Sequence, residues 1–499
     1  MKRIFLAAII VLITFGINAA EETIEEKTMK LIFSWQMEEA EKNIKKTDNP
    51  PDYVSGIYHF YKGDYEKAFP YLSNSKPVSE FWLDIIGKNM PVIQKFRTLE
   101  TKYFRIRYTG RDEVLAVYLS DIADKAVEEL HERLNWKPKE KAIIEIYPTR
   151  KSFQTASTLT DKHIKVSGAI GICKFNRIMI SSPRILKFGY SWADTVTHEY
   201  VHFIIGHVTG LVNMPLWMNE GLAKHLEECW RKKESSISPV GNNFLVRTRD
   251  SGNWVELNKM KHGMPSLETS DEVTLAFAQV QSMTGFLVRE YGWDKVTEFL
   301  NMIRDEDADS SFEKIFGTQV SGFQKNWEEY IKSRDIEITP GASAPSFAFS
   351  EEPVNAVSEW VSETAVTDLT IADRFKEAGK HEFAVKKYLA ALEKDTGNPV
   401  ILNKLAKVQI ITGSTKEAKK NFLSAIKANP SYAPPYLHLG ELLFKEKEYK
   451  KAQKYIKEYI YISPFNPMSH EMLLEIYKET KEKKKEEREE KILSILSEH

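Results

Sequence analysis

A 34-residue spacing in the C-terminal third of the chain limits its fold more than any other feature of the sequence. Three series of residues keep this spacing. Two consist of small residues, Ala372-Ala406-Gly440 and Ala384-Ala418-Ala452, and the third of large apolar residues, Tyr388-Phe422-Ile456. One period accommodates a pair of antiparallel helices, and the small residues let the two helices approach closely. Because one such hairpin cannot bury its apolar face alone, the spacing predicts a row of stacked helical hairpins.

This pattern resembles the tetratricopeptide repeat (TPR), which implies an all-α array that binds a protein partner. Three repeats run from residue 365 to about 467, and further helices cap them. Residues 481–490 have the pattern of a helix of dense mixed charge, which we expect to be a solvated cap. A single similar hairpin, with Gly56 and Ala68 as its small residues, lies near the N-terminus, where an ordinary αα-hairpin would give the same pattern.

Between these helical regions the pattern changes to that of a small sheet followed by helices. Residues 103–108 and 142–147 read as strands on either side of an amphipathic helix at 112–134. Residues 165–173 and 177–181 read as a hairpin. Further helices are expected over 275–291, 293–304 and 312–334. A mixed sheet followed by helices predicts an α+β domain.

A metal-binding pattern lies in the first helix after this sheet. Residues 198–202 read His-Glu-Tyr-Val-His within a run, 191–207, that has a helical pattern. Residues four apart share one helical face, so His198 and His202 can direct their imidazoles at one ion, with Glu199 beside them to hold a water molecule. Catalytic zinc needs three protein ligands and an open position. The downstream choices for the third are His207, Glu220, His225, Glu227 and Glu228.

The spacing of the third ligand separates these choices. Metzincin zinc peptidases have Gly three residues and His six residues after the second His, where this chain has Ile205 and Val208. His207 follows His202 by five residues and leaves the ligand face. Glu220 lies 18 residues past His202, after a turn and at the start of a second helix. Two antiparallel helices joined in this way can bring its carboxylate to the same ion.

The two motifs together resemble the bacterial peptidase MA-like family of gluzincins, which are thermolysin-like zinc peptidases. The motifs are His198-Glu199-x-x-His202 and an Asn-Glu-Gly-Leu-Ala segment at 219–223, and the similarity covers about residues 100–332. The resemblance implies a zincin-like domain with one Zn²⁺ bound by His198, His202 and Glu220. It implies Glu199 as the general base that activates water and passes the proton to the leaving amine.

The same resemblance bears on the surroundings of this site. It implies that the strand at 168–173 pairs with an extended peptide or protein substrate. Asp194, one turn before His198, is a candidate acceptor for the imidazole of His198, or else an ordinary carboxylate at a helix start.

One segment departs from the family pattern. Relatives often have Ala-Tyr-Ala-Gln-Ser where residues 276–280 read Ala-Phe-Ala-Gln-Val, so Phe277 lacks a hydroxyl that could stabilise the oxyanion. Tyr190, Tyr200 and His225 are candidate replacements. Two functions remain: a zinc metallopeptidase whose TPR array recruits a partner or substrate, and a catalytically weak or inactive zincin scaffold that acts as a protein interaction module in the cell envelope.

The first residues have the pattern of an export signal. Lys2 and Arg3 precede an apolar run at 4–17, which small residues follow at 18–20. The run is short for a bilayer span, so we expect a signal peptide and an exported protein, periplasmic or secreted. Membrane contact is expected only if this segment stays as an uncleaved anchor. In an oxidising compartment Cys173 and Cys229 could form a disulfide; otherwise they are two buried thiols.

The 499 residues are too many for one ordinary core. The predicted organisation is a signal peptide at 1–20, a helical region with a TPR-like hairpin at 21–98, a zincin peptidase MA-like domain at 99–335, a linker at 336–362 and a TPR array at 363–499. The predicted fold class is therefore α+β, with all-α hairpins on both sides. Lys and Arg number 70 and Asp and Glu 71, so no global field favours nucleic acid.

Overall fold

The computed structural model describes residues 22–211, 214–342 and 360–498. It divides into two compact units, Met1–Trp82 and Leu83–His499. The predicted signal peptide and most of the predicted linker fall outside the described residues. Within the described ranges, no helix has both the length and the apolar character needed to cross a bilayer.

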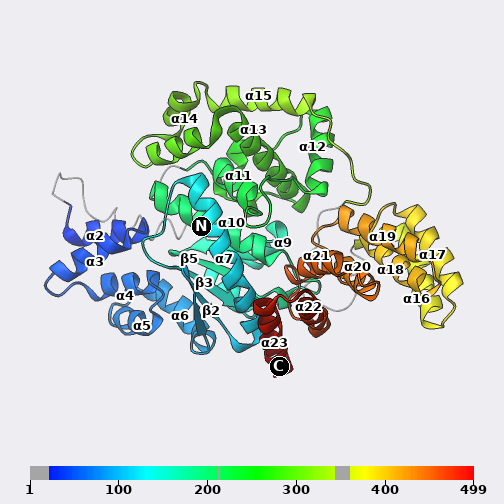
Figure 1. The fold of residues 1–499 in the computed structure, drawn as a ribbon. Helices are drawn as coiled ribbons and strands as arrows, with labels where there is room; N and C mark the ends of the chain where they lie inside the picture. Colours follow the sequence, from blue (N-terminus) through cyan, green and yellow to red (C-terminus); the bar gives the residue numbers. More distant parts are fainter. Residues whose placement is uncertain (1–21, 212–213, 343–359, 499) are drawn as a thin grey trace. The chain divides into compact units, whose positions relative to one another are not determined.

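The N-terminal unit consists of helical hairpins (Figure 1). Gly56 in one helix lies against Leu72 in the next, where a Cβ atom on Gly56 would stand 2.7 Å from the Leu72 side chain. The structure thus has a close-packed hairpin where the sequence predicts one. The helices are α2 (Ile24–Phe33), α3 (Met37–Lys46), α4 (Asp52–Tyr61), α5 (Tyr65–Asn74) and α6 (Glu80–Ile93), the last of which continues into the second unit.

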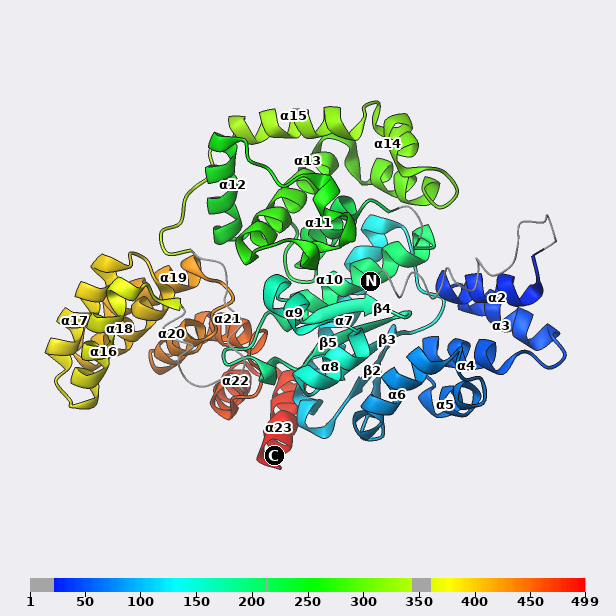
Figure 2. The ribbon, with the colours of Figure 1, turned by 180° about the vertical axis from the view of Figure 1, so that it is seen from behind.

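The second unit contains a five-stranded sheet with the order β1-β2-β3-β5-β4 (Figure 2). The three inner strands are parallel, and β1 and β4 are antiparallel edge strands. The connection from β2 to β3 runs through α7 (Glu113–Leu134). The strands are β1 (Arg97–Glu100), β2 (Phe104–Tyr108), β3 (Ala142–Tyr147), β4 (Gly171–Lys174) and β5 (Arg177–Ser181).

The strand predicted at 165–173 is shorter in the structure. Its first residues belong to a helix, α9 (Asp161–Ser167), which Thr160 caps at the start and which Gly168 ends with a φ of 65°. A short apolar run does not by itself distinguish a strand from a helix, and here the caps decide. The turn from β4 to β5 is as predicted, because Phe175 and Asn176 both have positive φ, which suits a two-residue hairpin turn.

One face of the sheet is covered by α10 (Trp192–Thr209). The register places Phe104, Ile144 and Ile178 on the same face. Tyr200 of α10 packs its ring on that of Phe104, with centroids 5.0 Å apart. The sheet therefore fixes the position of the helix that carries His198 and His202.

More helices surround this sheet and complete the α+β part. A positive φ at Gly292 interrupts one long helix, as the two predicted helices on either side of residue 292 require. The helices are α8 (Arg150–Ser157), α11 (Leu216–Leu226), α12 (Pro239–Ser251), α13 (Ser270–Met302), α14 (Ala308–Phe316) and α15 (Val320–Ser333). Short 3₁₀ helices lie at η1 (Gly110–Asp112), η2 (Pro183–Ile185), η3 (Leu257–His262) and η4 (Met264–Ser266).

The C-terminal region is a series of antiparallel helical hairpins, and its small residues lie where the 34-residue spacing predicts. Ala384, Ala418 and Ala452 are fully buried. The helices are α16 (Glu363–Glu377), α17 (His381–Lys394), α18 (Pro399–Ile411), α19 (Thr415–Ala428), α20 (Pro434–Lys445), α21 (Tyr449–Ile460), α22 (Pro467–Thr480) and α23 (Lys483–Ser497). The predicted fold class, α+β with all-α hairpins, is confirmed.

The last helix is not simply a solvated cap. Glu489 in α23 is fully buried, and its carboxylate accepts hydrogen bonds of 2.8 Å from the Tyr118 hydroxyl of α7. His470 of α22 contacts the same carboxylate at 2.8 Å. A run of mixed charge shows only that most of its side chains are solvated, so the one buried acid could not be picked out from the sequence.

Candidate metal centre

The candidate centre is built by two consecutive helices, α10 and α11. His198 and His202 lie one turn apart on α10, and Glu220 lies in the second turn of α11. Gly210 ends α10 in the left-handed conformation, with a φ of 67°, and its N–H donates to the Gly206 carbonyl. This end allows the chain to turn back, so that α11 returns beside α10.

The three side chains meet in a geometry that suits one metal ion. The Nε2 atoms of His198 and His202 are 3.1 Å apart. Glu220 Oε2 lies 3.5 Å from the first and 3.6 Å from the second. A tetrahedral zinc ion with bonds of about 2.0–2.1 Å separates its ligand atoms by roughly 3.3–3.4 Å. Across the described part of the chain, no second group of three such side chains comes as close together.

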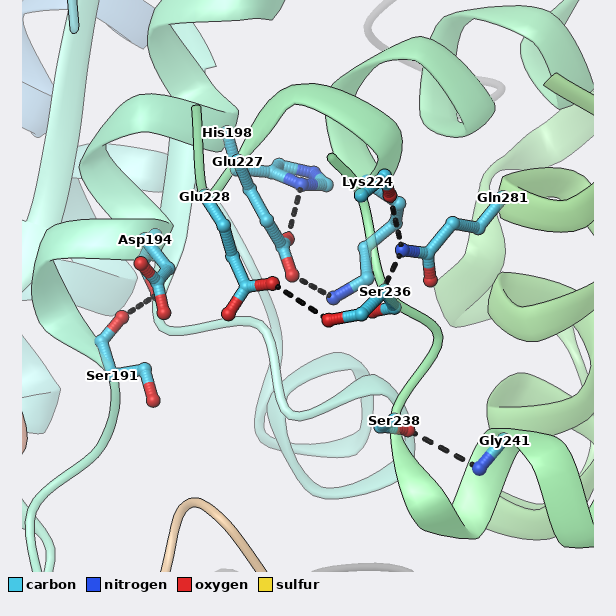
Figure 3. Close-up of polar contacts among 12 residues, drawn as sticks. Ser191, Asp194, His198, Lys224, Glu227, Glu228, Ser236, Ser238, Gly241 and Gln281 are labelled. Carbon is cyan, nitrogen blue, oxygen red and sulfur yellow. Dashed lines mark hydrogen bonds and ion pairs between the residues drawn. The ribbon is translucent and has the colours of Figure 1, made fainter. Parts of the chain in front are cut away.

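The outer nitrogen of each imidazole has its own partner. His202 Nδ1 lies 3.0 Å from Asn219 Oδ1. His198 Nδ1 lies 3.2 Å from Glu227 Oε2, and Glu227 also accepts a 2.6 Å hydrogen bond from Lys224 (Figure 3). Such partners fix the tautomer and the orientation of a ligating imidazole. Both rings are thus held with Nε2 directed at the shared position.

Asp194 does not take the role that the sequence analysis offered as one alternative. Its carboxylate accepts hydrogen bonds from Trp230 Nε1, at 3.0 Å, and from Arg231. The acceptor on His198 is Glu227, which the sequence analysis considered only as a metal ligand. One signal was available: Glu227 follows Glu220 by seven residues, which is two turns along the same face of a helix.

Each of the residues 219–221 has a separate task. Asn219 holds His202, and Glu220 supplies the third ligand atom. Gly221 lets α11 approach α13, since a Cβ atom on it would stand 2.2 Å from Thr284 Oγ1 and 2.7 Å from the Val280 carbonyl oxygen. The sequence alone indicates a ligand in this motif; the structure accounts for the other two positions.

Glu199 is buried beside the ligands and under the edge strand β4. A Cβ atom on Gly171 would stand 2.6 Å from Thr195 Cγ2 and 3.0 Å from Glu199 Oε1, so the strand backbone lies directly against this carboxylate. Burial raises the pKa of Glu199, an effect that His198 and His202 oppose in part. A raised pKa makes the carboxylate a stronger base than an exposed one.

The site carries excess negative charge when it is considered without an ion. Burial lowers the pKa of His198, but Glu220, Glu227 and Glu199 together outweigh burial and raise it to about 10. Burial raises the pKa of Glu220, but the imidazoles of His202 and His198 outweigh burial and hold this pKa well below its usual range. The buried carboxylates therefore favour a cation at this position.

The remaining predicted candidates lie elsewhere. His207 is not in the group that His198, His202 and Glu220 form: its Nε2 is 2.9 Å from Asn176 Oδ1, and burial lowers its pKa to about 4. Tyr190 donates its hydroxyl to the Ser181 carbonyl, and Tyr200 packs on the sheet. The ring of His225 lies 6.0 Å from that of Trp293.

Phe277, Cys173 and Cys229 were also singled out from the sequence. Phe277 lies on α13 with its ring 5.8 Å from Lys224 Nζ, so an apolar ring stands where the family pattern has a hydroxyl. Cys173 and Cys229 are both free, and no disulfide joins them.

Comparison with known proteins gives two family matches. The sequence profile of the Peptidase MA superfamily matches residues 122–333, and a tetratricopeptide repeat profile matches residues 433–466. No curated protein sequence matches the chain.

Several solved structures show a weak similarity to the chain. Leukotriene A4 hydrolase from Saccharomyces cerevisiae is 13% identical, with a TM-score of 0.31, over 80% of this chain and 67% of that one. MamA from Desulfovibrio magneticus RS-1 is 19% identical, with a TM-score of 0.26, over 28% and 79%. The first TPR of Spaghetti (RPAP3), bound to an HSP90 peptide, is 21% identical, with a TM-score of 0.23, over 24% and 96%.

The profile matches and the local structure lead to the same assignment. The matched segment 122–333 includes the two helices of the candidate centre, and the segment 433–466 coincides with the hairpin of α20 and α21. The chain therefore contains a zincin-like domain of the Peptidase MA superfamily, followed by a region of tetratricopeptide repeats.

Proposed function

We propose that the chain is an exported zinc metallopeptidase that hydrolyses peptide bonds. The observation that carries this proposal is that one possible ligand atom each of His198, His202 and Glu220 lies within 4.8 Å of the other two. Glu199 is buried beside them. The superfamily match supports a hydrolase. The proposal adds three points to this match: the ion is one Zn²⁺, the reaction is peptide hydrolysis, and the protein is exported.

The side chains of the site suit acid–base chemistry on a peptide bond. A zinc ion bound by the three ligands would supply Lewis acidity, which polarises a carbonyl group and lowers the pKa of water. Glu199 is placed to accept the proton of the attacking water and to return it to the leaving amine nitrogen. Its raised pKa makes it a better proton acceptor than an exposed carboxylate. Asn219 and Glu227 keep the two imidazoles in place while Glu199 acts.

The edge strand β4 suits an extended peptide as the substrate. β4 is the last strand in the sheet order, and such an edge can add one more strand by main-chain hydrogen bonds. Because Gly171 has no side chain, the backbone of β4 lies against Glu199. A peptide paired along β4 would therefore pass close to the proposed base.

A second candidate function has its own supporting observation. Phe277 gives no hydroxyl to an oxyanion, and Tyr190 is occupied by the Ser181 carbonyl. Loss of one oxyanion donor costs about 2.7–4 kcal/mol of transition-state stabilisation. The alternative is a weakly active or inactive zincin scaffold whose tetratricopeptide region binds a protein partner.

One experiment separates these two functions. The full chain without residues 1–20 is analysed for zinc content and for cleavage of a peptide library, alongside Glu199→Gln and a control, Glu132→Gln. Glu132 is exposed on α7, so its substitution should change neither property. We expect one zinc ion in all three proteins, and a loss of cleavage of at least about 100-fold in Glu199→Gln alone.

The possible results have distinct meanings. Wild-type protein without stoichiometric zinc would rule out both the peptidase and the zinc-loaded scaffold. Zinc without any Glu199-dependent cleavage would favour the scaffold. Export is checked separately by cell fractionation and N-terminal sequencing of the full-length product, which should begin near residue 21.

A further inference from the structure

A short turn links the candidate metal centre to the tetratricopeptide region. This turn, residues 227–231, directly follows α11 and is closed by backbone hydrogen bonds from Cys229 N to Leu226 O and from Arg231 N to Glu228 O, both 3.0 Å. Glu227 at its start is the partner of His198. Trp230 and Arg231, at the end of the turn, make contacts with other parts of the molecule. A change in these contacts can shift Glu227, because Arg231 follows it by only four residues.

The end of the turn is fastened to the start of α10. Trp230 and Arg231 each donate to a different oxygen of Asp194, which stands one turn before His198. Figure 3 shows Asp194 and Glu228 near His198 and Glu227. The turn and the metal-binding helix are thus held together at two points: at Asp194, and at the contact between His198 and Glu227.

The third repeat contacts this same place. Arg231 uses its other terminal nitrogen, Nη1, to pair with Glu458 in the last turn of α21. The ring of Tyr461, the next residue after α21 ends, lies 4.8 Å from that of Trp230, edge to face. Arg231 therefore contacts three carboxylates: Asp194 on α10, Glu228 within the turn itself, and Glu458 on the repeat.

The repeat also contacts α10 directly. Trp192 Nε1, in the first turn of α10, donates to the Ile460 carbonyl at 2.9 Å, and Tyr190 N donates to the Ile462 carbonyl at 3.2 Å. A Cβ atom on Gly189 would stand 2.1 Å from the Ile462 carbonyl oxygen. The end of the third repeat is thus packed on the segment that begins the metal-binding helix.

We propose that Glu458 of the third tetratricopeptide repeat is a positioning residue of the metal centre. Glu458 holds Arg231, Arg231 and Asp194 hold the end of the 227–231 turn, and the turn holds Glu227 on His198 Nδ1. The repeat region is then part of the apparatus that sets metal affinity, besides any partner that it binds. This inference rests on the proposed zinc site.

The test measures zinc affinity of the full chain without residues 1–20, by competition with a chromophoric chelator. Glu458→Gln removes the negative charge that pairs with Arg231, with little change of shape. We expect it to weaken zinc binding roughly tenfold, the low end of what loss of an outer partner of a ligand costs. The control is Glu448→Gln in the same repeat, since Glu448 pairs with the exposed Lys451; it should change affinity less than about twofold.

A double mutant distinguishes positioning from general loosening of the fold. If Glu458 acts through Glu227, then Glu458→Gln should have little further effect on zinc affinity in a Glu227→Gln background. Wild-type affinity in Glu458→Gln, an equal loss in Glu448→Gln, or an undiminished tenfold loss in the Glu227→Gln background would each overturn the inference. A wild-type chain that binds no zinc would instead refute the proposed function, and this inference with it.

Discussion

At the scale of single residues, the candidate centre is a buried group of carboxylates whose charge must be balanced. Glu199, Glu220 and Glu227 all lie near His198, and together they raise its pKa to about 10 against the effect of burial. In the metal-free protein His198 is therefore protonated at neutral pH. Zinc requires a neutral imidazole, so binding must displace this proton.

This competition predicts how zinc affinity depends on pH. Below pH 10 the proton and zinc compete for His198, so affinity should rise about tenfold per pH unit between pH 6 and 8 for each proton displaced. Chelator competition at pH 6, 7 and 8, corrected for the chelator's own protonation, measures this slope. Calorimetry in two buffers of different ionisation enthalpy should show release of at least one proton, and a flat affinity profile would contradict the assignment.

Sequence spacing predicted the three side chains that come together at this centre, but not the residues that hold them in place. His198, His202 and Glu220 follow from helix periodicity and from two motifs, because ligands on one helical face have fixed spacings. Asp194 and Glu227 could not be ranked in this way. Asp194 is one turn from His198 along the chain, yet Trp230 and Arg231 occupy it, and that depends on where α11 ends.

At the scale of helices and strands, length decided what could be predicted. The long α7 and α10 and the inner strands β2 and β3 were predicted nearly to their observed bounds, because each has a sustained period. Short elements gave weaker signals. Residues 165–167 were read as strand although Thr160 and Gly168 cap a helix there, and α12 was not predicted.

The approach of α11 to α13 supplies a prediction at this scale. Gly221→Ala places a Cβ atom 2.2 Å from Thr284 Oγ1, so the two helices must separate. Overpacking of this kind costs about 1–3 kcal/mol of unfolding free energy. Because Glu220 is the preceding residue, zinc affinity should fall as well. Urea unfolding and chelator competition measure the two effects.

The control for this substitution is Gly87→Ala in α6, where nothing lies within 4 Å of the added atom. There the higher helix propensity of alanine should leave the protein unchanged or stabilise it by up to about 1 kcal/mol. A Gly221→Ala protein with the stability and zinc affinity of wild type would show that α11 and α13 are not in the close contact described above.

At the scale of the whole molecule, the C-terminal region is attached to the peptidase domain at more than one place. Besides the contact of the third repeat with α10, α23 packs on α7 through a buried polar cluster. Glu489 accepts from Tyr118 and contacts His470, whose other ring nitrogen lies 2.8 Å from the Pro464 carbonyl oxygen. Arg488 pairs with Asp121 of α7 at 2.9 Å.

This cluster predicts that Glu489 contributes to stability far more than its neighbour. Removing one member of a buried charged network leaves the others without a counter-charge and costs about 3–5 kcal/mol. Glu489→Gln should therefore lower the unfolding free energy by about 3 kcal/mol, the low end of that range, because Arg488 keeps Asp121. Glu490→Gln, whose side chain is half-exposed beside Lys478, should change it by less than about 0.5 kcal/mol. Urea unfolding of both variants measures the difference.

Equal stabilities would mean that α23 behaves as the solvated cap that its charge pattern suggests. The buried contact with α7 would then contribute nothing to joining the repeats to the Peptidase MA superfamily domain.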